Sequence, residues 1–255
     1  METGAITGYI DVAQIVLYLF WLFFFSLIIY LHRENKREGY PTVSDQPGQL
    51  NPLGLFGMPE PKTFLLGNGK SVQSPPAGGP AERLIKAEPT SGAPGAPLEP
   101  TGDPLVDGVG PASWAQRHDE PDLCTDGQPK IVPLRVASGY EVASEDDDPV
   151  GMDVVSADGF VVGQVTDLWV DRAESYLRYF EVQPADGSAH LLVPVPFTTI
   201  KRNQVRVASL YGKQFANVPR TRAADQITLL EEDRVSGYFG GGHLYADPSR
   251  LGPLL

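Results

Sequence analysis

Residues 12–31 read VAQIVLYLFWLFFFSLIIYL, a run of twenty residues that contains no charged side chain. At roughly 1.5 Å of rise per residue, a helix of this length spans roughly 30 Å, the thickness of the hydrocarbon core of a bilayer. A helix satisfies its own backbone hydrogen bonds, which lipid requires of any spanning segment. The run therefore predicts one transmembrane helix over residues 12–31, within an N-terminal segment of residues 1–35.

The charges that flank this run distinguish an anchor from a signal peptide. No Lys or Arg precedes the run, whereas Arg33, Lys36 and Arg37 follow it. A signal peptide has positive charge before a shorter apolar run and a small-residue cleavage site after it. Positive charge on the C-terminal side predicts that the rest of the chain faces the cytoplasm.

Residues 36–105 are predicted to form an extended strap. Between Pro41 and Pro100 the sequence holds 12 prolines and 9 glycines, which disfavour helix. Short strands are expected at Lys62–Leu66 and Glu82–Lys86. A disordered linker is the alternative, but apolar residues recur along the segment, and we favour a strap that lies on the surface of a partner.

Residues 106–255 are predicted to form a globular domain. Short apolar runs suggest strands at Ile131–Val136, Gly139–Val142, Val154–Ser156, Phe160–Val165, Leu168–Asp171, Tyr179–Val182, His190–Val195 and Gln204–Leu210. Turn residues at 157–159, 185–187 and 202–203 separate several of them, which indicates a small barrel or sandwich. A helical pattern follows over residues 225–240, and Gly240–Gly242 is expected to end that helix. The predicted fold class is thus a membrane-anchored, mainly-β α+β protein.

Composition excludes several functions. The chain of 255 residues has a net charge of −12, which argues against nucleic-acid binding. A single cysteine excludes an intramolecular disulfide and any cysteine-rich metal centre. The sequence contains no catalytic motif of a common hydrolase, kinase or nucleotide-binding enzyme, and its histidines lack metal-ligand spacing. We therefore expect neither an enzyme nor a metal site.

Carboxylates are the chemistry that remains, and they gather in the run Glu145–Asp148, which we interpret as a solvated acidic face, and in three further groups. Closely packed carboxylates hold one another's pKa values up, and a chain of them linked by water can pass protons. A solvated acidic face or structural ion pairs would give the same pattern. The three groups are Asp119, Glu120, Asp122 and Asp126 beside Lys130; Asp167, Asp171 and Glu174 around Trp169; and Glu231, Glu232 and Asp233.

Long strings of the sequence resemble one family. They are Tyr30–Pro41, Pro59–Phe64, Thr101–Pro104, Asp107–Trp114, Asp167–Asp171 and Thr228–Asp233, in this order. The chain is similar to the H subunit family of the photosynthetic reaction centre of purple bacteria. Residues 151–210 also resemble the small β domain called the PRC barrel, which agrees with the strand pattern.

The resemblance implies an accessory subunit in the bacterial inner or chromatophore membrane, with its N-terminus in the periplasm. Such a subunit caps the cytoplasmic face of the L and M subunits, shields the quinone sites and helps to deliver protons to the reduced secondary quinone. It binds no cofactor alone, whereas the complex carries bacteriochlorophyll, bacteriopheophytin, quinones and non-haem iron. The resemblance leaves open whether the complex also contains carotenoid, bound lipids, a cytochrome subunit or a light-harvesting antenna. Membrane lipids are expected around the helix.

The resemblance also suggests roles for individual residues. Glu174 is the first choice for a proton-path carboxylate, accompanied by Asp171 and Arg178. Lys130 and Asp122 match the region where protons enter, with Asp126 and His118 as alternatives. An internal acidic network is expected at Glu231, Glu232 and Asp233, and contacts with partner loops or the membrane surface are expected at Glu34 and Arg37.

The sequence departs from some relatives at a possible metal site, and two other functions compete with that of a reaction centre subunit. Relatives with a metal site have a histidine pair in the entry loop, but residues 123–130 of this chain contain no histidine, so no metal is expected there. A membrane-tethered enzyme and a stand-alone PRC-barrel adaptor of RNA or ribosome maturation are the competing functions. The missing catalytic motifs count against the first, and the anchor and acidic charge count against the second.

Overall fold

The computed structural model describes residues 4, 6–7, 9–40, 56–67, 69–75, 84–93 and 95–252. Its internal contacts divide the chain into two compact units. The first unit comprises residues 1–84 and 91–96, and the second comprises residues 85–90 and 97–255. Each unit is described by itself.

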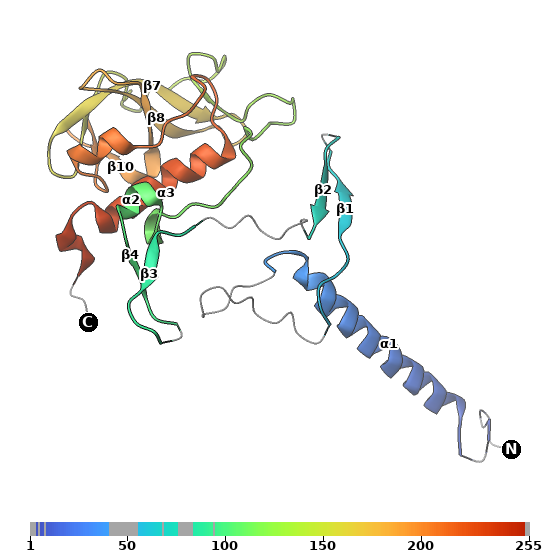
Figure 1. Cartoon of the computed structure of the whole chain (residues 1–255). Helices are drawn as coiled ribbons and strands as arrows, with labels where there is room; N and C mark the ends of the chain where they lie inside the picture. The colour runs from blue at the N-terminus through green and yellow to red at the C-terminus, as the bar shows by residue number, and fades with distance from the viewer. Residues whose placement is uncertain are drawn as a thin grey trace. The chain divides into compact units, whose positions relative to one another are not determined.

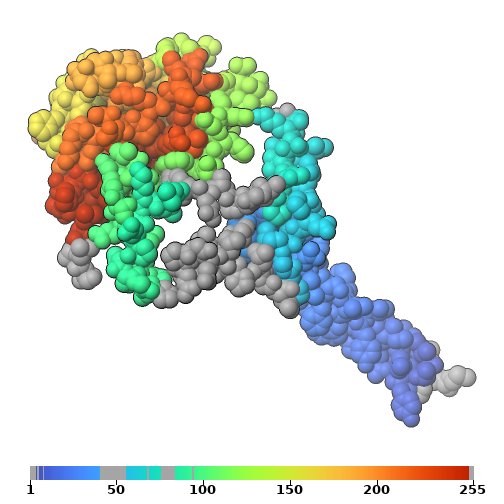
Figure 2. Space-filling model, viewed as in Figure 1, coloured from blue at the N-terminus to red at the C-terminus, as the bar shows by residue number. Residues whose placement is uncertain are grey.

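The first unit is built on one long helix, α1 (Val12–Glu34), followed by a 3-10 turn η1 (Asn35–Arg37). Asp11 caps the N-terminus, because its carboxylate accepts a hydrogen bond from the backbone N–H of Gln14 at 2.7 Å. No α1 residue is buried within the chain, and the atoms of the helix, in blue, are visible on the face shown in Figure 2. The helix is long and apolar enough to cross a membrane, so it fits the predicted single-pass anchor.

A two-stranded hairpin completes the described part of the first unit. β1 (Lys62–Leu65) pairs antiparallel with β2 (Ser71–Ser74), which confirms the strand expected near Lys62–Leu66. The strand expected at Glu82–Lys86 is not found in its described part, residues 84–86. Much of the predicted strap, including residues 41–55, lies outside the described residues.

The second unit is centred on a seven-stranded sheet with the order β10-β11-β6-β7-β8-β9 and with β5 paired to β7. Its strands are β5 (Ile131–Pro133), β6 (Asp153–Val155), β7 (Val161–Asp171), β8 (Tyr176–Pro184), β9 (Leu191–Pro194), β10 (Thr198–Ile200) and β11 (Gln204–Val207). The pairs are antiparallel except β11 with β6. The strands β7 and β8 are the longest of the sheet (Figure 1), and Asp171 is the last residue of β7.

Shorter elements surround the sheet. They are the hairpin of β3 (Ala87–Pro89) and β4 (Leu98–Pro100), the helices α2 (Pro104–Asp107) and α3 (Leu229–Tyr245), and the 3-10 turns η2 (Gly110–Ala112), η3 (Val195–Phe197), η4 (Gly212–Asn217) and η5 (Pro248–Leu251). α3 lies beside α2 (Figure 1). The core joins inward side chains of the sheet to the apolar face of α3, including Trp169, Phe180, Val235 and Phe239.

The predicted turns and most strands of this domain are confirmed, but the strands expected at Phe160–Val165 and Leu168–Asp171 form one strand, β7, and a further expected strand is wrong. Gly159 and Gly187 adopt positive φ in the turns before β7 and after β8, and Arg202 and Asn203 do so between β10 and β11. The expected strand Gly139–Val142 is absent, because Gly139 has a φ of 91° that breaks the extended backbone. Tyr140 instead donates a hydrogen bond from its hydroxyl to the carbonyl of Arg172 at 2.8 Å.

The C-terminal helix is present but its predicted bounds, 225–240, are wrong. It begins after Thr228, whose hydroxyl accepts from the N–H of Glu231, and it continues through the three glycines to Tyr245. A Cβ on Gly241 would lie 2.4 Å from Cβ of Ala112, and one on Gly242 would lie 2.5 Å from Leu210. These glycines are therefore close-packing positions of the helix and not its end.

Candidate functional site

A tight hairpin over residues 122–130 presents the first group of candidate residues. The backbone N–H of Lys130 donates to the carbonyl of Asp122 at 2.8 Å, and the N–H of Cys124 donates to the carbonyl of Gln128 at 2.9 Å. Gly127 closes the turn with a φ of 76°, a conformation that glycine adopts without strain. The hairpin thereby places the side chains of Asp122 and Lys130 at its open end, next to β7.

Lys130 is the centre of a carboxylate cluster. Its Nζ lies 3.4 Å from Oδ2 of Asp171, 3.5 Å from Oε1 of Glu174 and 3.8 Å from Oδ2 of Asp122. Burial disfavours the charged ammonium, but the three carboxylates outweigh this effect and raise the pKa of Lys130 above its usual value. The structure therefore brings together four of the residues predicted from the sequence.

Within this cluster, Asp171 is buried and Glu174 is exposed. Oδ1 of Asp171 accepts hydrogen bonds from the backbone N–H groups of Ala173 and Glu174 at 3.0 and 3.1 Å. The Asp171 side chain is 1 % exposed and that of Glu174 is 60 % exposed. The cluster thus runs from solvent at Glu174 to the protein interior at Asp171.

Glu232 on α3 forms a second group with residues of β8. Its Oε2 lies 3.3 Å from Nη2 of Arg178 and accepts a hydrogen bond from the hydroxyl of Tyr179 at 3.2 Å. Burial raises the pKa of Glu232 above its ordinary value, the Arg178 guanidinium opposes this rise, and the charge of Asp122 adds to it. The charge of Asp122 thus acts on Glu232, which links the Lys130 cluster electrostatically to this second group.

This arrangement can take up and pass protons. Glu174, Asp122 and Glu232 carry titratable carboxyl groups, and their side chains are progressively less exposed in this order. The ammonium of Lys130 lies near the carboxylates of both Glu174 and Asp122. Carboxylates in reach of one another, directly or through a bridging water, can exchange protons. A proton relay works best when the pKa of each group is near the working pH. The raised pKa of Glu232 therefore favours both the gain and the loss of a proton by this carboxyl group.

Asp126 and His118 lie at the edge of this arrangement. Oδ2 of Asp126 is 2.7 Å from Nη2 of Arg172, and the N–H of Gln128 donates to its other oxygen. These hydrogen bonds lower the pKa of Asp126, which favours its permanent ionisation. His118 is exposed, and its carbonyl accepts from the N–H of Leu230. The structure does not bring His118 into the Lys130 cluster.

The other two acidic residues of α3 hold backbone segments. Glu231 completes a capping box, because its Oε2 accepts from the N–H of Thr228 at 3.0 Å and its Oε1 from that of Arg222 at 3.0 Å. Oδ2 of Asp233 accepts from the N–H of Ala115 at 2.6 Å. Of the three, Glu232 alone contacts Arg178 and Tyr179 in the described structure.

Glu34 and Arg37 form an ion pair at the C-terminal end of α1. Nε and Nη2 of Arg37 lie 2.8 and 3.0 Å from the two carboxylate oxygens of Glu34. Arg37 also donates to the carbonyl of Ser74 at 2.7 Å, and Lys62 lies 2.8 Å from Glu34. The pair therefore ties the helix end to the β1–β2 hairpin within the first unit, and its predicted contact with a partner stays a prediction.

Two family models match the chain. The model of the photosynthetic reaction centre H-chain N-terminal region matches residues 4–136, more than half of the 255 residues. The chain belongs to this H-chain family. The PRC-barrel domain model matches residues 141–214, which contain strands β6 to β11. Both the predicted family and the predicted barrel are thereby confirmed, and the chain is a subunit of a photosynthetic reaction centre.

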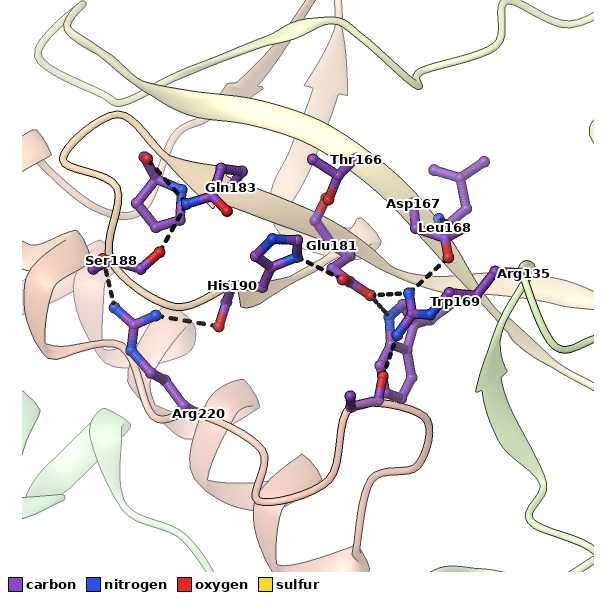
Figure 3. Close-up of polar contacts among 12 residues, drawn as sticks. Arg135, Thr166, Asp167, Leu168, Trp169, Glu181, Gln183, Ser188, His190 and Arg220 are labelled. Atoms are coloured by element: carbon purple, nitrogen blue, oxygen red, sulfur yellow. Dashed lines mark hydrogen bonds and ion pairs between the residues drawn. The ribbon is translucent and has the colours of Figure 1, made fainter.

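Sequence reasoning missed a third polar group in this H-chain family member, centred on Glu181 of β8. Figure 3 shows Glu181 between His190 on one side and Arg135 and Trp169 on the other. Its Oε2 accepts from Nη1 of Arg135 at 2.7 Å and from Nε1 of Trp169 at 2.8 Å. Its Oε1 lies 2.6 Å from Nδ1 of His190. Glu181 is 7 % exposed, so this carboxylate is a buried structural hub.

The hub joins several segments of the barrel. Arg135 also pairs with Asp167 at 2.7 Å and donates to the carbonyl of Ala224. Burial disfavours the charged form of Glu181, but hydrogen bonds from Arg135, Trp169 and His190 outweigh it and lower the pKa of this carboxyl. The only sequence signal was an isolated charge within the apolar run Tyr179–Val182. Arg135 is 46 residues away along the chain, and no spacing pattern links it with Trp169 and His190.

Metal ligation finds no support in the described part of the chain. No group of three or more His, Cys, Asp or Glu side chains is arranged there to hold a metal ion. The 122–130 hairpin carries Cys124, Asp126 and Gln128, and the carboxylate of Asp126 forms an ion pair with Arg172. The Lys130 cluster is consistent with proton chemistry, because its central cation is an ammonium group.

Proposed function

We propose that this chain caps the cytoplasmic face of the L and M subunits of the reaction centre and conducts protons to the reduced secondary quinone. In this proposal it also stabilises the complex and shields the quinone sites from water. Membership of the H-chain family supports a role in the reaction centre. The series of titratable groups from Glu174 through Lys130 and Asp122 to Glu232 carries the proposal of proton conduction.

The physical requirement for such a path is simple. A doubly reduced quinone takes up two protons, and a quinone site that is shielded from water receives them only through polar groups of the protein. A cap of apolar side chains alone would block the reaction. A cap with an exposed carboxylate at one end and a buried one of raised pKa at the other excludes bulk water and still transfers protons.

The proposal assigns pigments and redox cofactors to the partner subunits. Bacteriochlorophyll, bacteriopheophytin, the quinones and the non-haem iron would be held by L and M, and this chain would act as a non-enzymatic accessory subunit. The exposed apolar surface of α1 supports a position against lipid and partner helices. Purification from native membranes tests this part, since co-purification with pigmented partners is expected and a colourless monomer would contradict it.

Orientation is proposed from charge. Arg33, Lys36 and Arg37 follow the apolar run, so the second unit should lie in the cytoplasm and the N-terminus in the periplasm. Added protease is expected to digest the second unit in inside-out chromatophore vesicles and to spare it in intact spheroplasts. Digestion in intact spheroplasts would reverse the assignment.

The proton path is tested in the intact complex with Glu174→Gln and Glu232→Gln. Both variants keep the shape of the side chain and remove its ability to ionise. We expect each to slow the second electron transfer to the secondary quinone after paired flashes, because that step is coupled to proton uptake. Glu145→Gln, on an exposed acidic stretch, is the control and should match the native complex. Unchanged flash kinetics between about pH 6 and pH 9 in both variants would remove these residues from the path.

A further inference from the structure

A buried hydroxyl group, that of Tyr179 on β8, contacts the carboxylate of Glu232. Tyr179 is 2 % exposed and belongs to the core between the sheet and α3. Its hydroxyl donates to Oε2 of Glu232 at 3.2 Å and also forms a hydrogen bond with the side chain of Ser236. The proton path from Glu174 to Glu232 does not use these two hydroxyl groups.

Tyr179 joins Glu232 and Ser236 into one series of hydrogen bonds. A phenol has one proton to donate and lone pairs that accept, so Tyr179 donates to Glu232 while Ser236 donates to the Tyr179 oxygen. Glu232 and Ser236 are four residues apart on α3, a spacing that places both side chains on one face of the helix. The series therefore leads from Glu232, through a buried phenol, to the partly exposed Ser236, about 6 Å further along the helix axis.

Hydroxyl groups arranged in this way can pass a proton and stay neutral. When Glu232 is ionised, both hydroxyl protons point toward its carboxylate. Once the carboxyl group is protonated, it donates to the Tyr179 oxygen, and both hydroxyl groups turn to donate in the opposite direction. Glu232 then gives its proton to Tyr179 while Tyr179 gives its own to Ser236. Ser236 gives its own proton to an oxygen acceptor outside this chain, so one proton moves and no hydroxyl gains a charge.

The surroundings of Tyr179 keep its hydroxyl protonated. Burial and the charge of Glu232 raise the pKa of Tyr179 above its usual value, although Arg178 and the hydrogen bond from Ser236 oppose this rise. A phenolate is therefore not formed near neutral pH. Transfer through Tyr179 takes the concerted form, in which the hydroxyl accepts one proton as it donates another.

We infer that Tyr179 and Ser236 continue the proton path beyond Glu232 and release the proton from this chain at the surface of α3. The inference rests on the proposed function, because it takes Glu232 as the proton donor. It adds an exit to the path and defines the acceptor by its chemistry. The acceptor is an oxygen base next to Ser236, either a water molecule or a carboxylate of a partner subunit.

The test uses the intact reaction centre and measures the second electron transfer to the secondary quinone after paired flashes, from about pH 6 to pH 9. Tyr179→Phe keeps the ring and removes the hydroxyl, so it should lower the maximum rate about tenfold. Ser236→Ala should have the same effect. Ser236→Thr keeps a hydroxyl group and should retain most of the rate.

Two controls separate loss of the relay from loss of structure. Tyr238→Phe is the matched variant, because it removes another buried tyrosine hydroxyl, which donates to the carbonyl of Gln214. It should leave the rate unchanged. The yield of pigmented complex and the first electron transfer, which forms a semiquinone without a bound proton, report the assembly of each variant and should also be unchanged.

A role of Tyr179 in positioning alone would give a different pH dependence. Burial and the charge of Asp122 raise the pKa of Glu232, whereas Arg178 and the hydrogen bond from Tyr179 lower it. Loss of that hydrogen bond alone would move the rate profile to higher pH and leave its maximum unchanged. A relay predicts instead that the maximum falls. When Glu232→Gln and Tyr179→Phe are combined, the loss of rate should not exceed that of the slower single variant, because the two groups act in series.

Two results would overturn the inference. The first is a native maximum rate in Tyr179→Phe and Ser236→Ala while Glu232→Gln is slow, which would reject the exit and leave the path to Glu232 in place. The second is a profile of Tyr179→Phe that is shifted in pH with no loss of maximum rate, which would make Tyr179 a positioning residue. A native rate in Glu232→Gln would contradict the proposed path itself.

Discussion

The ammonium of Lys130 lies 3.4 Å from the carboxylate of Asp171, and the Asp171 side chain is 1 % exposed. A buried carboxylate needs a compensating charge or several hydrogen bonds, because transfer of an ion out of water is costly. Asp171 has both, since two backbone N–H groups bind its Oδ1 and Lys130 faces its Oδ2. The two residues also join the 122–130 hairpin to the end of β7.

Lys130→Met is therefore expected to destabilise the full chain by about 3 kcal/mol, the usual cost of leaving one member of a buried ion pair alone. Lys130→Arg keeps the charge and should cost much less. When Asp171→Asn is added to Lys130→Met, the further loss of stability should be smaller than the loss caused by Asp171→Asn alone, because the carboxylate has already lost its cation. Strictly additive losses in chemical denaturation would show that the pair does not interact.

The sequence predicts the main parts of this fold for clear physical reasons. The anchor follows from a charge-free run of sufficient length, and the hairpin turns follow from residues such as Gly159 and Asn203 that tolerate positive φ. The sequence also places Asp122 beside Lys130 on one short loop, but it assigns Glu174 to a separate acidic group, and the pairing of β5 with β7 brings the two groups together.

Other features depend on tertiary packing, which local sequence does not encode. Gly241 resembles a helix end in the sequence, but Ala112 of a distant segment requires a small residue at that place. Glu181 resembles a surface charge on a strand, but Arg135 and His190 reach it from elsewhere in the chain. Residues of α3 that follow one another, Glu231 and Glu232, have different partners because helical rotation turns them in different directions.

Glu181→Gln should destabilise the chain at neutral pH by about 1–3 kcal/mol, because it weakens charge-assisted hydrogen bonds to Arg135 and Trp169. The pKa of Glu181 is lower in the folded chain than its ordinary value. The stability that this gives is present above the unfolded pKa and is lost as the pH falls through the folded one. The difference in unfolding free energy between the native chain and the variant should therefore become smaller at acidic pH. Denaturation midpoints measured as a function of pH check this.

Glu141→Gln, which alters an exposed carboxylate, is the control for this series. A pH-independent difference between the native chain and Glu181→Gln would indicate that the variant disturbs packing of the barrel and not its electrostatics.

Glu232 should show the opposite pH dependence. Its pKa is raised in the folded chain, chiefly by burial, so the folded state holds the proton more tightly than the unfolded chain does. The corresponding stability is present below the unfolded pKa and is lost as the pH rises through the folded one. Relative to Glu232→Gln, the native chain should lose stability from mildly acidic to neutral pH. A difference that grows in favour of the native chain over this range would contradict the raised pKa.

The glycines of α3 offer a test of packing that is independent of charge. Gly241→Ala would place a Cβ 2.4 Å from Cβ and 2.7 Å from Cα of Ala112, which forces the helix away from η2. The expected loss is about 1–2 kcal/mol, since overpacking outweighs the better helix propensity of alanine. Gly240→Ala is the matched control, because its nearest neighbours would be 3.6 and 3.8 Å away. The control should gain up to about 1 kcal/mol from helix propensity alone, and equal stabilisation of both variants would refute the close contact at Gly241.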